Sequence, residues 1–346
     1  MKKIKYLIFI LITVVLSTLL LSCAKTVYLK STSGGGNQAP KDCINIGHTF
    51  DEGLCIRCNA DYSTAIEFKL SEDESSYIVI SGDDCKDEEI IIPSEYNGKP
   101  VTAIGEGAFY YCASAKKVNI PESVAVIEEG AFHRCYNLEN VVFSEDSQLE
   151  SIGNSAFLFC DKLSAINIPA SIVSIGDGAF LHCFNLCEIT LPDEILHIGI
   201  NAFTYTGYYN KSDNWKNGQT LYIGNHFVSL SGSLSGTKFI VDEGTKVIAD
   251  GVFSECTTLR NVDIPSSVTS IGVYTFKGCT SLEYVNFAAG SELKIIYEKA
   301  FLHCDKLSRI NYGNSKSEWA AVIKQTNWDN DTSKFTVHCS DGDIIK

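Results

Sequence analysis

A single repeated unit constrains the fold of this chain more than any other feature. Seven of the fourteen cysteines stand three residues after a phenylalanine, and an isoleucine stands five residues before each of those phenylalanines. Successive units are 23 or 25 residues apart, except across one long gap. Such self-similarity indicates a solenoid, in which each coil buries its apolar edge only against its neighbours. The cysteines are Cys112, Cys135, Cys160, Cys183, Cys256, Cys279 and Cys304, and the phenylalanines are Phe109, Phe132, Phe157, Phe180, Phe253, Phe276 and Phe301.

The units follow the pattern L-x-x-V-x-I-P-x-S-V-x-x-I-G-x-x-A-F-x-x-C. Segments 166–169, 189–192 and 262–265 alternate apolar and polar residues before a proline. This alternation predicts short strands, and proline ends each strand because it removes a backbone donor. The spacing of Phe and Cys predicts a short helical corner that turns both side chains inward. We therefore expect a β-rich solenoid of coils about 23 residues long.

The repeat resembles the BspA-like leucine-rich-repeat family of bacterial surface proteins over about residues 66–346. Segments 104–112, 152–160 and 175–183 carry the resemblance, since each reads Ile-Gly, then three residues ending in Ala, then directly Phe-x-x-Cys. Departures are Thr206 for the cysteine, Ala249 for the glycine, and Ser144 and Ala288 for the proline. The resemblance implies a leucine-rich-repeat array, surface display and binding to proteins or host components, often in adhesion. It implies no catalytic residues.

The repeat cysteines are expected to be free thiols. Neighbouring coils lie roughly 5 Å apart, a spacing that permits disulfides, yet equivalent side chains on successive coils point in parallel, whereas a bridge needs Cβ vectors that converge. A ladder of buried thiols follows, each packing as a small hydrophobe. We expect a serine at Cys160 to bury a hydroxyl without a ready partner. Cys85, Cys187 and Cys339 lie outside the repeat register and stay unassigned.

The N-terminal residues predict that the protein is exported from the cytoplasm. Lys2, Lys3 and Lys5 precede an apolar run over residues 6–21, and Leu20-Leu21-Ser22-Cys23 resembles a bacterial lipobox. We expect residues 1–22 to be a signal peptide and Cys23 to be lipidated, so that a membrane anchor holds the chain. A transmembrane anchor is the alternative. Residues 23–41 are small and polar, as in a flexible tether.

Residues 42–62 contain a compact Cys/His motif. Cys43, His48, Cys55 and Cys58 have a spacing that suits a tetrahedral ion, so we expect a structural Zn²⁺ site with no open position for catalysis. A disulfide of Cys55 with Cys58 or Cys43 is the alternative.

The remaining segments divide into the array and its two ends. Residues 63–100 predict an N-terminal cap with strands near 77–80 and 89–93, and residues 101–313 predict the solenoid. Residues 314–346 predict a C-terminal cap, in which a capping box at Ser315 and Glu318 opens a short helix and Trp328 seals the end. Such caps cover the end coils of a solenoid.

The long gap predicts an insertion at about 204–244, with a degenerate coil over 221–245. Aromatic residues are dense there, on what we expect to be a projecting hairpin: Tyr205, Tyr208, Tyr209, Trp215 and Tyr222. Two interpretations stay open. The rings form a contact surface for protein or carbohydrate, or they pack over the edge of the irregular coil, which is the simpler of the two.

The net charge and the lack of common catalytic motifs reduce the classes of function that the sequence predicts. The formal net charge is −14 and becomes −17 without the three lysines of the leader, which argues against nucleic-acid partners. No phosphate loop, zinc-protease helix or nucleophile elbow is present in the sequence. We therefore predict a cell-surface scaffold that binds proteins or host extracellular components, and not an enzyme. The alternative is a structural envelope protein that spaces or self-assembles without a ligand.

Overall fold

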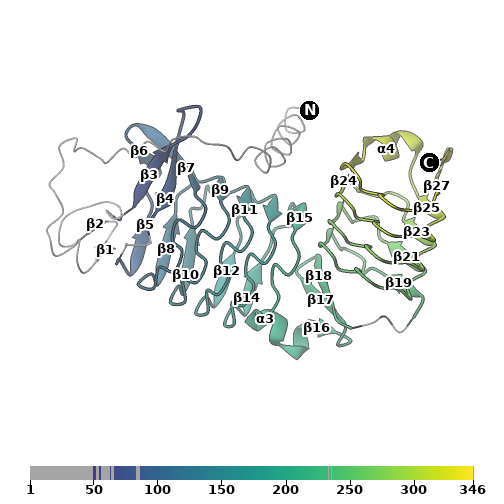
Figure 1. The fold of residues 1–346 in the computed structure, drawn as a ribbon, viewed down its shortest axis with the longest axis horizontal. Helices are drawn as coiled ribbons and strands as arrows, with labels where there is room; N and C mark the ends of the chain where they lie inside the picture. The colour runs from purple at the N-terminus through teal and green to yellow at the C-terminus, as the bar shows by residue number, and fades with distance from the viewer. Residues whose placement is uncertain are drawn as a thin grey trace. The chain divides into compact units, whose positions relative to one another are not determined.

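The computed structural model describes residues 50–51, 54–55, 63, 66–82, 86–232, 234 and 236–345, with the backbone alone at 50–51 and 54–55. Cys23, Cys43, His48, Cys58 and Cys85 lie outside the described residues. Each coil contributes two short strands, one from the Ile-Gly segment and one from the segment before proline (Figure 1). Successive coils pair through these strands in parallel, so the predicted solenoid is confirmed.

The Ile-Gly segments form what we call the isoleucine ladder. Ile104, Ile127, Ile152, Ile175 and Ile198 pair in register from coil to coil. Before the insertion its strands are β3 (Glu67–Leu70), β4 (Tyr77–Ser81), β7 (Lys99–Ile104), β9 (Val126–Ile127), β11 (Ser151–Ile152), β13 (Ser174–Ile175) and β15 (His197–Ile198), with β6 (Glu95–Tyr96) against β7. After the insertion they are β18 (His226–Leu230), β20 (Val247–Ile248), β22 (Ser270–Ile271), β24 (Ile295–Ile296) and β26 (Ile323–Lys324).

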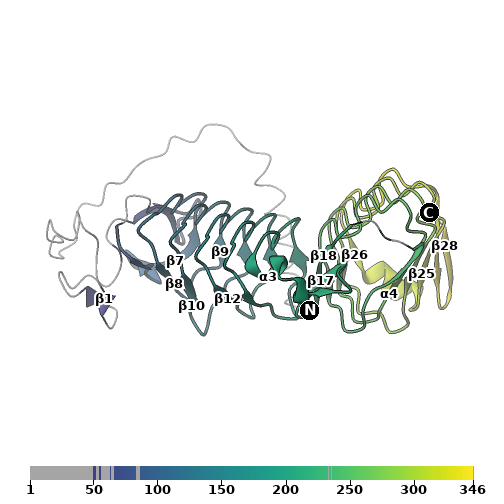
Figure 2. The same cartoon turned by 90° about the horizontal axis from the view of Figure 1, so that it is seen from below.

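The segments before proline, together with strands at the same side of the coils that precede no proline, form a second set of strands, separated from the first by the core. These are β5 (Glu89–Ile91), β8 (Lys117–Ile120), β10 (Asn140–Phe143), β12 (Ala165–Asn167), β14 (Glu188–Thr190), β19 (Lys238–Ile240), β21 (Asn261–Ile264), β23 (Tyr284–Phe287), β25 (Arg309–Tyr312), β27 (Thr336–Cys339) and β28 (Gly342–Ile345). Figure 2 shows the coils from β7 to β12 stacked one behind another. A separate hairpin pairs β1 (Phe50–Asp51) with β2 (Leu54–Cys55).

The repeated phenylalanines stack face to face in the core. Ring centroids from Phe109 through Phe132, Phe157 and Phe180 to Phe203 lie 5.1 to 5.4 Å apart, with planes within 7° of parallel. The five side chains are at most 3% exposed. A second stack runs through Phe253, Phe276 and Phe301 at 5.2 and 5.1 Å. The coils on each side of the insertion are therefore held by spines of Ile and Phe, as the repeat predicts.

The corners between Phe and Cys are turns, so the prediction of short helical corners was wrong. In the coil of Phe109, the amide of Tyr110 donates to the carbonyl of Gly107, and the amide of Cys112 donates to that of Phe109. The residue before Cys has a positive φ in every coil, for example 59° at Tyr111 and 61° at His182. A left-handed residue cannot continue a right-handed helix, and it points its side chain out of the coil.

The repeat thiols are free in the structure, and they are not inert spacers. The Sγ atoms of Cys135, Cys160 and Cys183 lie 3.0 to 3.2 Å from the phenylalanine carbonyl of the preceding coil, to which each donates. Cys279 and Cys304 repeat this contact at 3.1 Å. The expectation that serine at Cys160 would lack a partner was therefore wrong, because the carbonyl of Phe132 already accepts there.

The insertion interrupts the isoleucine ladder and the second set of strands, and both resume after it. A three-stranded antiparallel meander joins β16 (Trp215–Lys216), β17 (Thr220–Ile223) and β18. Strand β18 pairs in parallel with β20, and β19 pairs with β21, so residues 221–245 do form a degenerate coil. Across the interruption, Nε2 of His197 lies 2.9 Å from Oδ2 of the buried Asp250, whose amide donates to the carbonyl of Ile198.

At the C-terminal end, helix α4 (Lys316–Ala321) has the predicted capping box. Ser315 Oγ accepts from the amide of Glu318, and the Glu318 carboxylate accepts from the amide of Ser315. Trp319 and Trp328 are 4% and 5% exposed and pack at 6.1 Å. Helix α4 does not have the length to span a membrane, and no other helix among the described residues does either. The sealing role of this region stays a prediction.

Candidate binding surface

Aromatic and histidine side chains line one corner of the five coils before the insertion. They occupy the two positions between the core phenylalanine and the cysteine position, where the turn directs side chains outward. We call this set the corner stripe. Its members are Tyr110, His133, Phe159, His182 and Tyr205, and they continue into the insertion through Tyr209 and Trp215.

The corner stripe is a continuous row of ring contacts. Centroid distances along it, from Tyr110 to Trp215, are 5.2, 6.2, 4.7, 4.9, 5.9 and 5.0 Å. Tyr111 and Phe184 flank the row at 55% and 48% exposed, and Tyr205 is 48% exposed. Adjacent exposed aromatic area of this kind typically marks an interaction site on a soluble protein.

The three coils after the insertion serve as an internal comparison. At the same corner positions they carry Ser254 and Glu255, Lys277 and Gly278, and Leu302 and His303. These coils keep the same phenylalanine stack, although their corner positions carry only one ring, that of His303. Corner rings are therefore not needed to form a coil. Three of them, Phe159, His182 and Tyr205, also stand at positive φ, which costs a non-glycine residue roughly 1–2 kcal/mol.

The five aromatic residues predicted as a site in the insertion divide into two groups. Tyr205, Tyr209 and Trp215 extend the corner stripe, and Nε1 of Trp215 donates to the carbonyl of Tyr209 at 2.6 Å. Tyr208 and Tyr222 are half-buried and pack against the core, with Tyr208 Oη donating to the Tyr222 carbonyl at 3.0 Å. Burial raises the pKa of Tyr222 to about 12. Packing over the irregular coil thus describes two of the five rings.

The expected projecting hairpin does not carry these rings together. Tyr205 lies in a turn, and Tyr208 and Tyr209 lie in helix α3 (Gly207–Asn210), which Thr206 caps by accepting from the Tyr209 amide. A 3-10 turn at Ser212–Asn214 leads to β16 and Trp215. The helix forms because Thr206, which replaces the repeat cysteine, supplies an N-cap oxygen.

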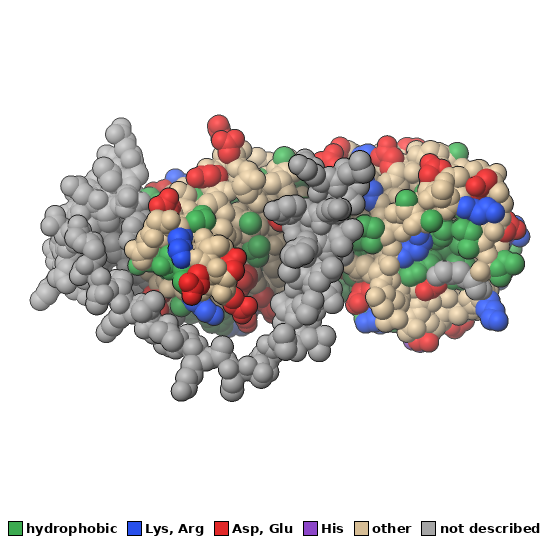
Figure 3. Space-filling model, turned by 90° about the horizontal axis from the view of Figure 1, so that it is seen from above, with side chains coloured by type: hydrophobic (Ala, Val, Ile, Leu, Met, Phe, Trp, Pro, Cys, Tyr) green, Lys and Arg blue, Asp and Glu red, His purple; other side chains and the backbone are tan. Residues whose placement is uncertain are grey.

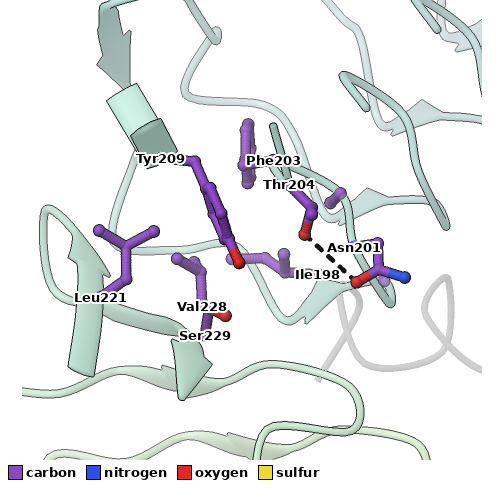
Figure 4. Close-up of a pocket in the computed structure, with 10 residues that line it drawn as sticks. Ile198, Asn201, Phe203, Thr204, Tyr209, Leu221, Val228 and Ser229 are labelled. Carbon is purple, nitrogen blue, oxygen red and sulfur yellow. Dashed lines mark hydrogen bonds between the residues drawn. The ribbon is translucent and has the colours of Figure 1, made fainter. Parts of the chain in front are cut away.

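A small hollow lies beside the insertion and does not suit a small-molecule ligand. Phe203, Thr204 and Tyr209 line one side, and Leu221, Val228 and Ser229 line the other (Figure 4). Its volume is about 10 Å³, far below the roughly 300–1,000 Å³ of typical ligand pockets. The exposed surface of the coils is a better candidate site than this hollow.

The strand face opposite the isoleucine ladder is an alternative surface, but several of its polar groups already have partners. Asn119 donates to Glu89 at 2.7 Å. Asp263 accepts from Asn286 at 2.7 Å and pairs with Lys238 at 2.7 Å, and Asn286 in turn accepts from Asn311. A ligand would have to replace these bonds, whereas the corner stripe offers apolar ring area directly.

The described residues offer little for catalysis or metal binding. They include no group of three His, Cys, Asp or Glu side chains placed to hold a metal. Burial raises the pKa of the Cys135 and Cys160 thiols, and it raises that of Cys256 to about 11, so these thiols stay protonated near neutral pH and are poor nucleophiles. His133 and His182 lie in the corner stripe, on separate coils.

The structure does not describe the side chains of the proposed zinc ligands or the proposed lipidation site. Cys23, Cys43, His48 and Cys58 lie outside the described residues. Only the backbone of Cys55 is described, in β2, where it pairs with Phe50. Both sites therefore stay predictions.

The repeated parallel coils and the row of surface rings define a solenoid that offers a surface, not a pocket. The sequence model of the BspA type leucine rich repeat region matches residues 83–214 and 223–326, in six copies. The chain belongs to this family.

Solved structures with similar folds are bacterial leucine-rich repeat proteins. One from T. pallidum is 23% identical, over 70% of this chain and 88% of its own, with a TM-score of 0.41. A leucine rich cell surface protein from Faecalibacterium prausnitzii is 21% identical over 76% and 97%, with a TM-score of 0.36. The pneumococcal vaccine antigen PcpA is 20% identical over 72% and 80%, with a TM-score of 0.36. A comparison with curated proteins found no match.

Proposed function

We propose that this protein is an exported, lipid-anchored scaffold that binds other proteins or host extracellular components at the cell surface, in an adhesion-type role. The observation that carries the proposal is the corner stripe, which is present on the five coils before the insertion and absent from the three after it. Because the same coil forms without corner rings, their exposure is best explained by contact with a partner. The proposal assigns binding and no catalysis.

Physical chemistry supports a macromolecular partner for this surface. Aromatic side chains bury roughly 150–250 Å² each and dominate the energetics of interfaces. Tyr and Trp are the side chains most often found to carry binding energy, because a rigid ring is ordered at little entropic cost. A row of rings that spans five coils offers a long, flat contact suited to a protein surface more than to a small molecule.

The experiment that tests this function compares capture with self-association. Purified full-length protein, immobilised, is offered a defined set of extracellular matrix proteins, and the same preparation is sedimented alone. We expect selective retention of at least one matrix protein and a monomer by analytical ultracentrifugation. Concentration-dependent self-association without retention would instead support the alternative of a structural envelope protein.

The lipid anchor is proposed from Cys23 at the end of the apolar run. We expect Cys23→Ala to leave an unprocessed precursor without acyl label, because the thiol is the acceptor of the lipid. Metabolic labelling with a fatty acid in a bacterial host measures this directly. Normal labelling and processing of the variant would rule the anchor out.

A structural zinc site is proposed from Cys43, His48, Cys55 and Cys58. Metal analysis of the purified chain should give about one zinc per chain, and Cys55→Ser should lose it because one of four ligands is removed. The matched control is Cys187→Ser, an exposed thiol in the repeat array, which should keep the metal. A Cys55 disulfide in metal-free protein would contradict the site.

A further inference from the structure

We propose that the corner stripe docks a cationic protein segment, with Lys and Arg side chains of the partner lying against its rings and against a row of carboxylates beside it. This assignment rests on the proposed function and deepens it, because it names the chemistry of the partner. Three observations support it: the row of carboxylates, the scarcity of basic groups at this corner, and the lysines that lie beside an aromatic ring after the insertion.

A row of acidic side chains accompanies the stripe. Glu106, Glu129 and Asp177 are exposed in the corner segments of three coils, four or five residues before the outward aromatic or histidine of the same coil. Gly107, which follows Glu106, approaches Tyr110, since a Cβ built on it would lie 3.9 Å from the Tyr110 Cβ. The row therefore runs beside the rings and gives the surface a negative edge.

Basic groups are scarce at the same corner. The segments 105–112, 128–135, 153–160, 176–183 and 199–206 contain four carboxylates and one arginine, Arg134. The corresponding segments after the insertion contain Lys277 and Lys299 against Glu255 and Glu298, with Asp250 buried. Acidic side chains are also spread along the coils in the view of Figure 3. The imbalance between acid and base is thus found where the stripe is.

One aromatic ring in the coils after the insertion has lysine side chains of the same chain beside it. Tyr274 stands at positive φ two residues before the core Phe276, outside the corner positions of the stripe, and the chain's own Lys277 and Lys299 lie 5.3 and 5.6 Å from its ring centroid. Lys299 Nζ also donates to Tyr274 Oη at 3.4 Å. This ring therefore already has cations from the chain itself, through attraction of a positive charge to a ring face.

Most rings of the stripe have no such cation from the chain. Arg134 donates to Tyr110 Oη at 3.2 Å, and the faces of Phe159 and Tyr205 stack on His182. The flanking rings Tyr111 and Phe184 are 55% and 48% exposed, and among the described residues no lysine or arginine lies over them. The stripe and its flanking rings thus combine exposed aromatic area without cations and carboxylates without salt bridges. Lys and Arg side chains of a partner would supply cations to both the rings and the carboxylates. Charge complementarity of this kind also speeds association.

The test uses a synthetic peptide of roughly a dozen residues in which arginine alternates with serine, and a control peptide with glutamate in place of arginine. Their affinities for the full-length protein are measured by calorimetry at low and at physiological salt. We expect the arginine peptide to bind, more weakly as salt screens the carboxylates, and the glutamate peptide not to bind. Binding of a neutral oligosaccharide in place of the arginine peptide would overturn the assignment.

Three variants locate the binding. The stripe variant Tyr111→Ala/Phe184→Ala/Tyr205→Ala truncates Tyr205 of the stripe and the two exposed rings that flank the row, and it keeps the net charge. Glu106→Gln/Glu129→Gln removes two carboxylates of the acidic row. Each should weaken the peptide Kd at least tenfold. The matched control Glu194→Gln/Glu243→Gln removes the same charge from exposed turns after β14 and β19 and should stay within twofold of wild type. Equal losses in both charge variants would mean that net charge alone attracts the peptide, and would overturn the proposal.

The same variants separate this proposal from the function on which it rests. If the stripe variant loses a captured matrix protein but binds the arginine peptide like wild type, the cationic assignment fails and the binding surface stands. If the stripe variant keeps both, the surface and its chemistry fail together.

Discussion

Phe157→Ala is expected to destabilise the protein by about 3–5 kcal/mol, the range found when a large buried side chain is deleted from a packed core. Phe157 is fully buried and stacks between Phe132 and Phe180 at 5.1 and 5.2 Å. Its loss leaves a cavity that two neighbouring coils share, and a solenoid has only nearest-neighbour contacts to compensate. Chemical denaturation followed by circular dichroism measures the change.

Phe159→Ala is the matched control for this deletion. Phe159 has the same side chain two residues further along, but the turn directs it outward into the corner stripe. We expect it to cost well under half as much as Phe157→Ala, because it is already partly in water and leaves no closed cavity. Similar losses at the two sites would show that the stripe is part of the structural core and would remove the reason to treat it as a surface.

Acidification is expected to destabilise the protein through His226, by roughly 2–3 kcal/mol at pH 4.5 relative to pH 7. His226 is fully buried in β18, and burial lowers its pKa to about 4 despite the nearby charge of Asp193. The unfolded chain takes up the proton near pH 6.5 and the folded chain only near pH 4, so the stability is complete above pH 6.5 and falls as the pH drops towards 4.

His226→Leu isolates this contribution from the other groups that titrate in acid. The free energy of unfolding is measured at both pH values for wild type and variant, and the variant should lose less on acidification by roughly that amount. His303→Leu, at an exposed corner position, should leave the wild-type pH dependence intact. An identical acid loss in wild type and His226→Leu would contradict the role of burial.

The repeat register could be predicted because it depends on side chains that recur in type. Isoleucine, phenylalanine and cysteine return at fixed spacing, and the structure pairs or stacks the equivalents of neighbouring coils. The degenerate coil over 221–245 was also predictable, since the gap holds two periods and Phe227 takes an isoleucine position opposite Ile248.

The corner stripe could not be predicted in the same way. Its positions hold Tyr110, His133, Phe159 and His182, which share neither one residue type nor one place in the unit. What aligns them is the left-handed backbone before each cysteine. No residue type predicts that conformation, because Tyr, Arg, Phe, His, Glu and Gly all occur there. The spacing of Phe and Cys fits a helical turn equally well, which is why helical corners were expected. A count of aromatic residues between each phenylalanine and cysteine is the signal that would have found the stripe.

The central claim is that the corner stripe is the surface through which this protein binds. The most direct measurement is the affinity of the full-length protein for a matrix protein that it retains, with Tyr111→Ala/Phe184→Ala/Tyr205→Ala compared against Ile240→Ala, which truncates a side chain that is 65% exposed on β19. We predict that the stripe variant weakens the affinity at least tenfold at an unchanged melting temperature, as loss of interface hot spots does, while Ile240→Ala has no effect. Wild-type affinity in the stripe variant, or equal loss in both, would contradict the claim.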